Sequence, residues 1–115
     1  MSNIKHPFGG AEIIALTATG VQAIAIKNDY TVIDGVTVEA TGNRTLNITV
    51  SDQITKEGRT PRLFVASKTD GVETTIFGTG ITAPTITGVA DKIKVQEFVY
   101  VLGSFHPVGA SVQVD

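Results

Sequence analysis

Residues 30–38 read YTVIDGVTV, and no other stretch of the chain says as much about its fold. β-branched and aromatic residues surround an Asp-Gly pair, and such a pair readily takes the positive φ angles of a two-residue turn. The stretch therefore predicts a β-hairpin that reverses at Asp34 and Gly35.

Strand-like patterns continue on both sides of this hairpin. Residues 45–50 alternate strictly, so Leu46, Ile48 and Val50 are expected to share one buried face. Pro84 lies in an extended Thr-rich stretch and indicates a sheet edge, where its missing amide donor does no harm. Further short strands, separated by Gly, Asn and Asp turns, are expected over residues 11–19, 21–27, 62–67, 72–77, 91–102 and 111–114.

The connections between these strands differ in kind. Residues 62–67 and 72–77 flank a short Gly-containing turn and are expected to pair as a second hairpin. Residues 51–61 form the longest polar stretch and are expected to be an exposed loop, a place where function often lies. Residues 1–10 are expected to be a flexible N-terminal arm in front of one β domain over residues 11–115.

The composition agrees with this pattern of short strands. Of the 115 residues, 42% are hydrophobic and only 17% are charged, and the straight-chain residues that favour helices are scarce. A chain of this length folds as one domain around one small core. The sequence therefore predicts an all-β fold, namely a single-domain β-sandwich, jelly roll or small barrel with little or no helix.

Charge and cysteine content argue against several classes of function. The formal net charge is -2, whereas proteins that bind nucleic acids usually carry clustered Lys and Arg. The chain has no cysteine, so it offers neither a disulfide nor a thiolate metal site. Residues 13–26 are too short and too polar to span a membrane, and two core strands are favoured there over a secretory leader. Neither a nucleic-acid nor a membrane partner is expected.

No catalytic constellation stands out in the sequence. The two histidines, His6 and His106, are too few for a metal site, because such sites need three or four protein ligands. Ser104 and His106, with either Asp91 or Glu97, have the residue types of a nucleophilic triad but lack the elbow and the oxyanion loop that this chemistry requires. The protein is therefore expected not to be an enzyme, and no catalytic, metal-binding or cofactor-binding residues are assigned.

The strand expected over residues 91–102 carries the strongest indication of a binding surface. Its second half is apolar on both faces, whereas one small core covers only one face of a strand. The face with Phe98, Tyr100 and Leu102 is therefore expected to bind a partner protein. Including the arm and the basic loop, the expected partner-binding residues are Phe8, Lys56, Arg59, Phe98, Tyr100 and Leu102.

Taken whole, the chain resembles the small β-rich structural proteins of tailed bacteriophages, in particular capsid decoration or cement proteins. The resemblance lies in the lack of cysteine, the arm over residues 1–10, the short Thr/Val strands and the Gly turns. It implies a non-enzymatic virion protein that decorates or stabilises a capsid through contacts with capsid or other virion proteins. It also implies a homo-oligomer, with a trimer as one form, that assembles in the host cytoplasm and resides in the virion.

An alternative comes from a different class of protein. A carbohydrate- or protein-binding Ig-like β-sandwich module of an adhesin or fibre would also have a long polar loop and Thr-rich strand faces. The mass in solution separates the two, because a decoration protein is expected to form oligomers or to bind a shell. A free-standing module is expected to be a monomer.

Overall fold

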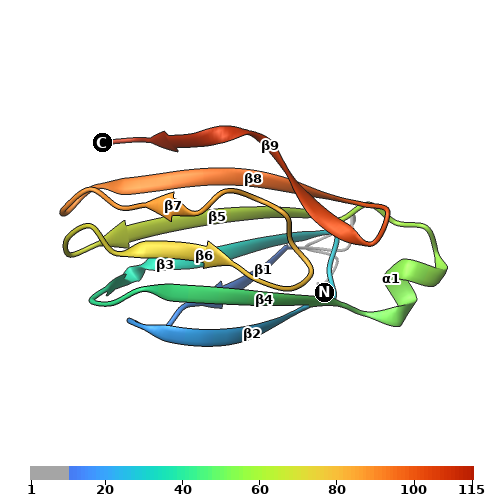
Figure 1. The fold of residues 1–115 in the computed structure, drawn as a ribbon. Coiled ribbons are helices and arrows are strands. Elements are labelled where there is room, and N and C mark those ends of the chain that lie inside the picture. The colour runs from blue at the N-terminus through green and yellow to red at the C-terminus, as the bar shows by residue number, and fades with distance from the viewer. Residues whose placement is uncertain (1–10) are drawn as a thin grey trace, which may run out of the picture.

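The computed structural model describes residues 11–115, which form nine strands and one short helix (Figure 1). The strands are β1 (Ala11–Ala15), β2 (Gly20–Ile26), β3 (Tyr30–Ala40), β4 (Arg44–Val50), β5 (Arg62–Thr69), β6 (Thr74–Phe77), β7 (Ile86–Thr87), β8 (Ile93–Val101) and β9 (Ser104–Gln113). The helix α1 (Asp52–Lys56) lies between β4 and β5. With 62% strand and 5% helix, the structure confirms the all-β class.

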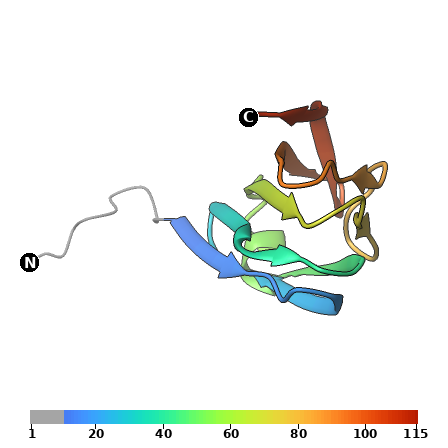
Figure 2. The same cartoon turned by 90° about the vertical axis from the view of Figure 1, so that its left-hand side faces the viewer.

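The strands form two mixed sheets, and the first six strands alternate between them. One sheet has the order β1-β3-β5-β8-β9 and the other the order β2-β4-β6-β7. Strands β1, β3 and β5 are parallel to one another, as are β2, β4 and β6, and the antiparallel strands β7, β8 and β9 complete the sheets. In Figure 2 the chain accordingly rises from the blue N-terminal strands at one end to the red C-terminal strand at the other.

The predicted hairpin at Asp34 and Gly35 is wrong. Strand β3 runs through both residues, Gly35 does not have a positive φ, and the register with β5 becomes irregular just after it. The Asp34 carboxylate accepts hydrogen bonds from the amides of Val36 and Thr37 at 2.9 and 3.0 Å and from the Thr37 hydroxyl at 2.6 Å. These bonds, the hydroxyl first, lower the pKa of Asp34 below its usual 3.8. The Asp-Gly pair thus marks an irregularity within one strand, where the side chain caps the local backbone.

The second predicted hairpin is also wrong, because its two strands belong to different sheets. β5 pairs with β3 and β8, whereas β6 pairs with β4 and β7, so the turn between β5 and β6 crosses from one sheet to the other. A tight hairpin joins β8 to β9, where Leu102 and Gly103 both have positive φ, at 54° and 90°. β9 therefore begins at Ser104, earlier than the strand over residues 111–114 that the sequence predicts. The exposed loop expected over residues 51–61 contains α1, whose Ile54 is fully buried.

The core lies between the two sheets. Leu46 and Ile48 of β4 are buried and Val50 packs against them, as the alternation predicted. The facing sheet contributes Ile33, Leu63, Val65, Phe98 and Phe105, each fully buried. The edge position expected around Pro84 is also confirmed, because β7, two residues farther along, is the last strand of its sheet.

A buried arginine lies among these apolar residues. Arg44, the first residue of β4, is only 1% exposed. Its guanidinium donates to the backbone oxygens of Gly35 and Lys68 at 2.9 Å each, Val38 at 3.1 Å and Thr17 at 3.2 Å. Burial lowers the pKa of Arg44, and the Asp34 carboxylate opposes this effect. One cation therefore ties β4 to three segments of the opposite sheet and its loops.

Gly35 leaves room for this arrangement, which gives it a role other than the predicted turn. A Cβ atom there would lie 2.8 Å from the Ala66 carbonyl oxygen and 3.2 Å from an Arg44 nitrogen. We expect Gly35→Ala to lower the free energy of unfolding by about 1–3 kcal/mol, because the rigid backbone of β5 has to move. Urea denaturation measures this change. Gly71→Ala is the matched control, since its Cβ would approach only the Glu73 carboxylate, and equal losses in both variants would contradict the steric explanation.

Candidate protein-binding face of the five-stranded sheet

The five-stranded sheet has a second side that faces away from the core. Side chains alternate along a strand, so the neighbours of the buried residues Ile33, Leu63 and Phe98 point outward. The strand register aligns these outward residues in rows that cross the whole sheet. One row is formed by Ile13, Val32, Phe64, Glu97 and Val108.

Most of these outward positions are apolar. We define the outer apolar face by ten outward residues of the five strands, namely Ile13, Tyr30, Val32, Phe64, Ala66, Ile93, Val95, Val99, Val108 and Val112. At the rim, Ile13 is 70%, Val108 49% and Val112 55% exposed. Phe64 and the other central members are partly buried among their neighbours. The face therefore presents apolar side chains on every strand from β1 to β9, with Asp34, Arg62 and Glu97 interspersed among them.

The charged groups on this side are engaged within the chain. Arg62 and Glu97, on neighbouring strands, form an ion pair at 3.0 Å. Lys68 lies 3.6 Å from Glu39, and the carboxylate of Asp34 binds its own backbone. Such pairs leave the valines and Phe64 as the dominant chemistry of the face.

The expected partner-binding role of Phe98 does not agree with its position. Phe98 is fully buried, belongs to the protein's own core, and its ring centroid lies 5.1 Å from that of Phe77. β8 does carry apolar residues on both faces, but its outward face holds Val95 and Val99. Phe98 therefore faces the core, and the apolar residues of β8 that point outward are Val95 and Val99.

Three other expected residues come together at one end of the molecule. Arg59, Tyr100 and Leu102 line a shallow hollow of about 420 Å³ next to α1. Leu102 is 98% exposed at the tip of the β8–β9 hairpin, whereas Tyr100 packs partly against the core. Arg59 forms ion pairs with Asp29 at 2.7 Å and Glu57 at 3.1 Å, which occupy its guanidinium.

Two further expected residues lie elsewhere. Lys56 is exposed at the end of α1, outside the lining of the hollow. Phe8 lies outside the described residues, as does the whole expected arm over residues 1–10. Within residues 11–115 the only helix is α1. It has five residues and is too short to cross a membrane.

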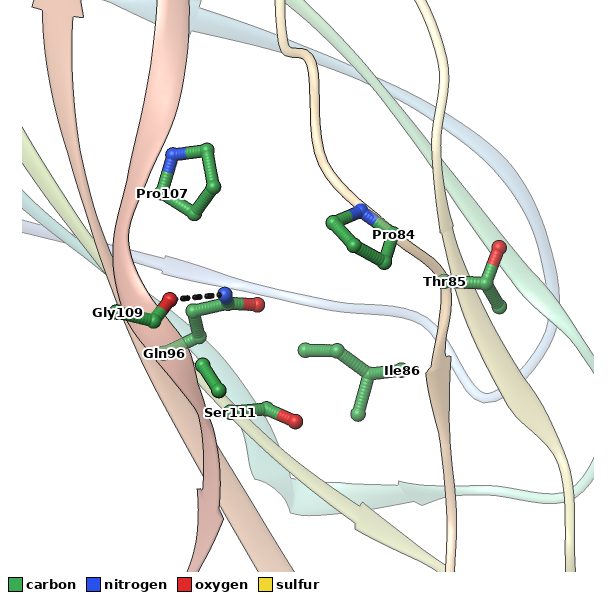
Figure 3. Close-up of a pocket in the computed structure, with 8 residues that line it drawn as sticks. Pro84, Thr85, Ile86, Gln96, Pro107, Gly109 and Ser111 are labelled. Carbon is green, nitrogen blue, oxygen red and sulfur yellow. Dashed lines mark hydrogen bonds between the residues drawn. The ribbon is translucent and has the colours of Figure 1, made fainter.

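A second hollow, of about 330 Å³, opens between β9 and the segment that leads into β7. Figure 3 shows Pro84 and Ile86 on one side and Pro107 on the other, with Gln96 between them. The Gln96 amide donates to the Gly109 carbonyl oxygen at 2.9 Å, across the irregular part of the β8–β9 register. Its lining residues contain no ionisable side chain, so this hollow offers space for a small apolar group and no acid–base chemistry.

Three carboxylates that the sequence analysis did not single out meet at the end of β3. Oxygen atoms of Glu39, Asp70 and Asp91 lie within 4.8 Å of one another. Oxygen donors of this kind suit hard cations such as Ca²⁺. The Lys68 ammonium already lies 3.6 Å from Glu39 and supplies positive charge there, and we assign the cluster no function.

The residue types of a nucleophilic triad do not form one here. The Ser104 hydroxyl lies 3.4 Å from the Thr82 hydroxyl and 3.4 Å from the carbonyl oxygen of Phe105, and His106 is exposed on the outer side of β9. Asp91 belongs to the carboxylate cluster at the other end of the sheet. The neighbours of the Asp91 carboxylate are therefore the carboxylates of Glu39 and Asp70. In this position Asp91 does not orient the His106 imidazole next to Ser104.

The outer apolar face could have been recognised from one signal in the sequence. Several strands contain two or more consecutive apolar residues, such as Ile13 with Ile14, Val32 with Ile33, and residues 63–66. A strand with one wet face alternates, whereas consecutive apolar residues indicate that both faces are apolar. The strand expected over residues 91–102 is the longest of these stretches, with apolar residues on both faces of its second half.

Comparison with known proteins does not indicate a function for this chain. Comparison with protein-family models, with curated proteins and with solved structures finds no match, so the function has to be inferred from the chain's own surface.

Proposed function

We propose that this protein is a non-enzymatic structural module that stabilises a larger assembly through protein–protein contacts. One observation carries the proposal, namely the outer apolar face that crosses all five strands of one sheet. A β-sheet in a small domain commonly has one face on the core and one in water. Here the outward face also carries apolar side chains on all five strands, among them Ile13, Phe64 and Val108.

The energetics favour a covered face. Soluble monomers rarely expose a contiguous apolar patch larger than a few hundred Å². Removing about 400 Å² of apolar surface from water contributes about 10 kcal/mol before the costs of association are subtracted. The free-energy cost of association is of similar size to this gain. We therefore expect stable binding only from a partner whose surface fits the face closely.

The proposal extends to the kind of assembly and to the architecture. We take the two facing sheets as a two-layer β-sandwich, because core residues come from both. The resemblance to capsid decoration proteins points to a capsid or another virion protein as the partner, and to the virion as the location. What supports this is the outer apolar face together with the overall style of the sequence.

The hollow beside α1 favours a second candidate function. The hollow is lined by the Arg59 guanidinium, the Tyr100 ring and the exposed Leu102 side chain. Ligand-binding pockets commonly combine apolar and aromatic side chains with a few polar groups in this way. An Ig-like module of an adhesin or fibre, binding a carbohydrate or a peptide there, is the alternative. Arg59 is already paired with two carboxylates, which makes the outer apolar face the stronger candidate.

Substitutions on the two surfaces separate these functions. We expect Phe64→Lys to weaken co-sedimentation with purified capsid shells at least tenfold, because the new ammonium would lose its hydration in the contact. Leu102→Lys, at the hollow, is expected to leave co-sedimentation unchanged. Loss of binding in Leu102→Lys alone would favour the ligand-binding module. A monomeric wild-type protein that binds no shell would contradict the assembly function.

A further inference from the structure

We infer that the partner covering the outer apolar face is a second copy of this chain, packed sheet against sheet about a two-fold axis. The inference rests on the proposed function and names a second copy, in place of the capsid protein, as the molecule that covers this face, so that a dimer takes part in the larger assembly. Three properties of the face support it: its area, its charge and the positions of its most exposed side chains.

The area of the face matches what a stable dimer needs. Neighbouring strands lie about 4.8 Å apart, so a sheet of five strands is about 20–24 Å wide. The central strands β5 and β8 have 8 and 9 residues, which at about 3.3 Å per residue gives a length of about 26–30 Å. The face therefore covers about 500–700 Å² in projection, close to the roughly 800 Å² that each partner of a standard interface buries.

The charges on this side of the sheet are self-compatible. Its charged groups have both signs, namely the carboxylates of Asp34, Glu39 and Glu97 and the cations of Arg62 and Lys68. The two-fold arrangement brings one patch against an identical patch, so a patch of one sign would repel itself. Three carboxylates and two cations give this side a formal charge of only -1, and opposite signs are interspersed on it. Arg62 and Glu97 are adjacent, and each of them has an opposite charge available in a second copy.

The most exposed apolar side chains lie on the two outer strands of the sheet. Ile13 of β1 and Val108 and Val112 of β9 stand at opposite edges, with the partly buried Phe64 between them. A second copy with the same shape covers both edges and the centre at once, because it carries a five-stranded sheet of equal width. A shorter segment or a single helix would leave one edge in water.

Sedimentation and light scattering on the purified full chain test the inference. The wild type is expected to have twice the 12.1 kDa mass of the single chain. We expect Phe64→Lys to weaken the dimer at least a hundredfold and to give a monomer at micromolar concentration. Ile76→Lys is the matched control, because Ile76 is 37% exposed on the outward side of the other sheet, and it is expected to remain dimeric.

Cross-linking keeps the test decisive if Phe64→Lys folds poorly. The chain has no cysteine, so a single Phe64→Cys variant carries one thiol. Packed sheets lie about 10 Å apart, and a short bis-maleimide reagent is expected to join two copies through residue 64 at high yield. The Ile76→Cys variant is expected to stay uncross-linked at the same concentration.

Each outcome has a definite meaning. Suppose that the wild type is a monomer that binds capsid shells, and that Phe64→Lys loses this binding. That result would contradict the second copy as the partner and would still agree with the proposed function. A mass of three chains, or a dimer that Ile76→Lys breaks and Phe64→Lys does not, overturns the two-fold sheet packing. A monomer with no shell binding overturns the proposed function as well.

Discussion

Replacing Arg44 with alanine is expected to lower the free energy of unfolding by on the order of 4 kcal/mol or more. The side chain is 1% exposed, so its removal leaves a cavity in the core. The carbonyl oxygens of Gly35, Lys68, Val38 and Thr17 would lose the donor that now satisfies them. Each buried carbonyl without a partner costs about 1–3 kcal/mol, which makes this the largest single-residue effect that we expect. Urea denaturation followed by circular dichroism measures it.

Two further variants show whether the loss comes from the buried hydrogen bonds. Arg44→Lys keeps the charge but cannot present the same fork of donors, so an intermediate loss is expected. Arg59→Ala removes a surface arginine with two ion pairs and is expected to cost no more than about 1 kcal/mol. If Arg44→Ala unfolds at the same urea concentration as Arg59→Ala, the buried hydrogen bonds of Arg44 do not contribute the stability that we expect from them.

Phe98→Ala is expected to cost about 3–5 kcal/mol, the usual range for removing a fully buried aromatic ring. Phe98 has no exposed surface, pairs with Leu63 of β5 and packs edge-on against Phe77 of the other sheet. Its loss would leave a cavity between the two sheets at the centre of the core. Thermal unfolding is expected to shift down by several degrees for each kcal/mol lost.

The comparison with Leu102→Ala decides which expected partner-binding residues are structural. Leu102 is 98% exposed at the hairpin tip, so its substitution is expected to change stability by less than about 0.5 kcal/mol. Equal stability of Phe98→Ala and Leu102→Ala would mean that Phe98 is a surface residue after all. A large loss confined to Phe98→Ala would support its place in the core.

The faces of single strands could be predicted from the sequence, and their neighbours could not. The alternation over residues 45–50 predicts correctly which side of β4 is buried, because side-chain direction repeats every two residues. The same repeat says nothing about which strand lies alongside. β4 pairs with β2 and β6, both in parallel, and neither pairing produces a turn signal in the sequence.

The Asp34–Gly35 pair shows how a local signal can be overruled. Asp and Gly permit a tight turn, yet here the carboxylate binds the Val36 and Thr37 amides while β3 continues. Glycine is required because the Ala66 backbone and the Arg44 guanidinium approach it closely. Both contacts come from residues distant in the sequence, so no local pattern could reveal them.

The outer apolar face was only partly predictable for a related reason. The apolar second half of β8 predicts two apolar faces, and two apolar faces leave no contrast to tell core from surface. The choice is made by the neighbouring strand, since Leu63 of β5 is buried opposite Phe98 while Phe64 faces outward beside Glu97. The pairing of β5 with β8 therefore has to be known before the face can be assigned.

The alternation of the first six strands between two sheets also governs how the chain reaches its folded state. Ala11 pairs with Tyr30, Gly20 with Arg44 and Tyr30 with Arg62, so each of these contacts closes a long loop. Loop closure costs entropy before pairing returns any free energy, and proteins rich in such contacts fold in milliseconds to seconds. The tight β8–β9 hairpin can form early, at the C-terminal end. During synthesis the first strands emerge well before β5, so their apolar residues, such as Ile13 and Val32, stay without their sheet partners and open to aggregation until β5 is made.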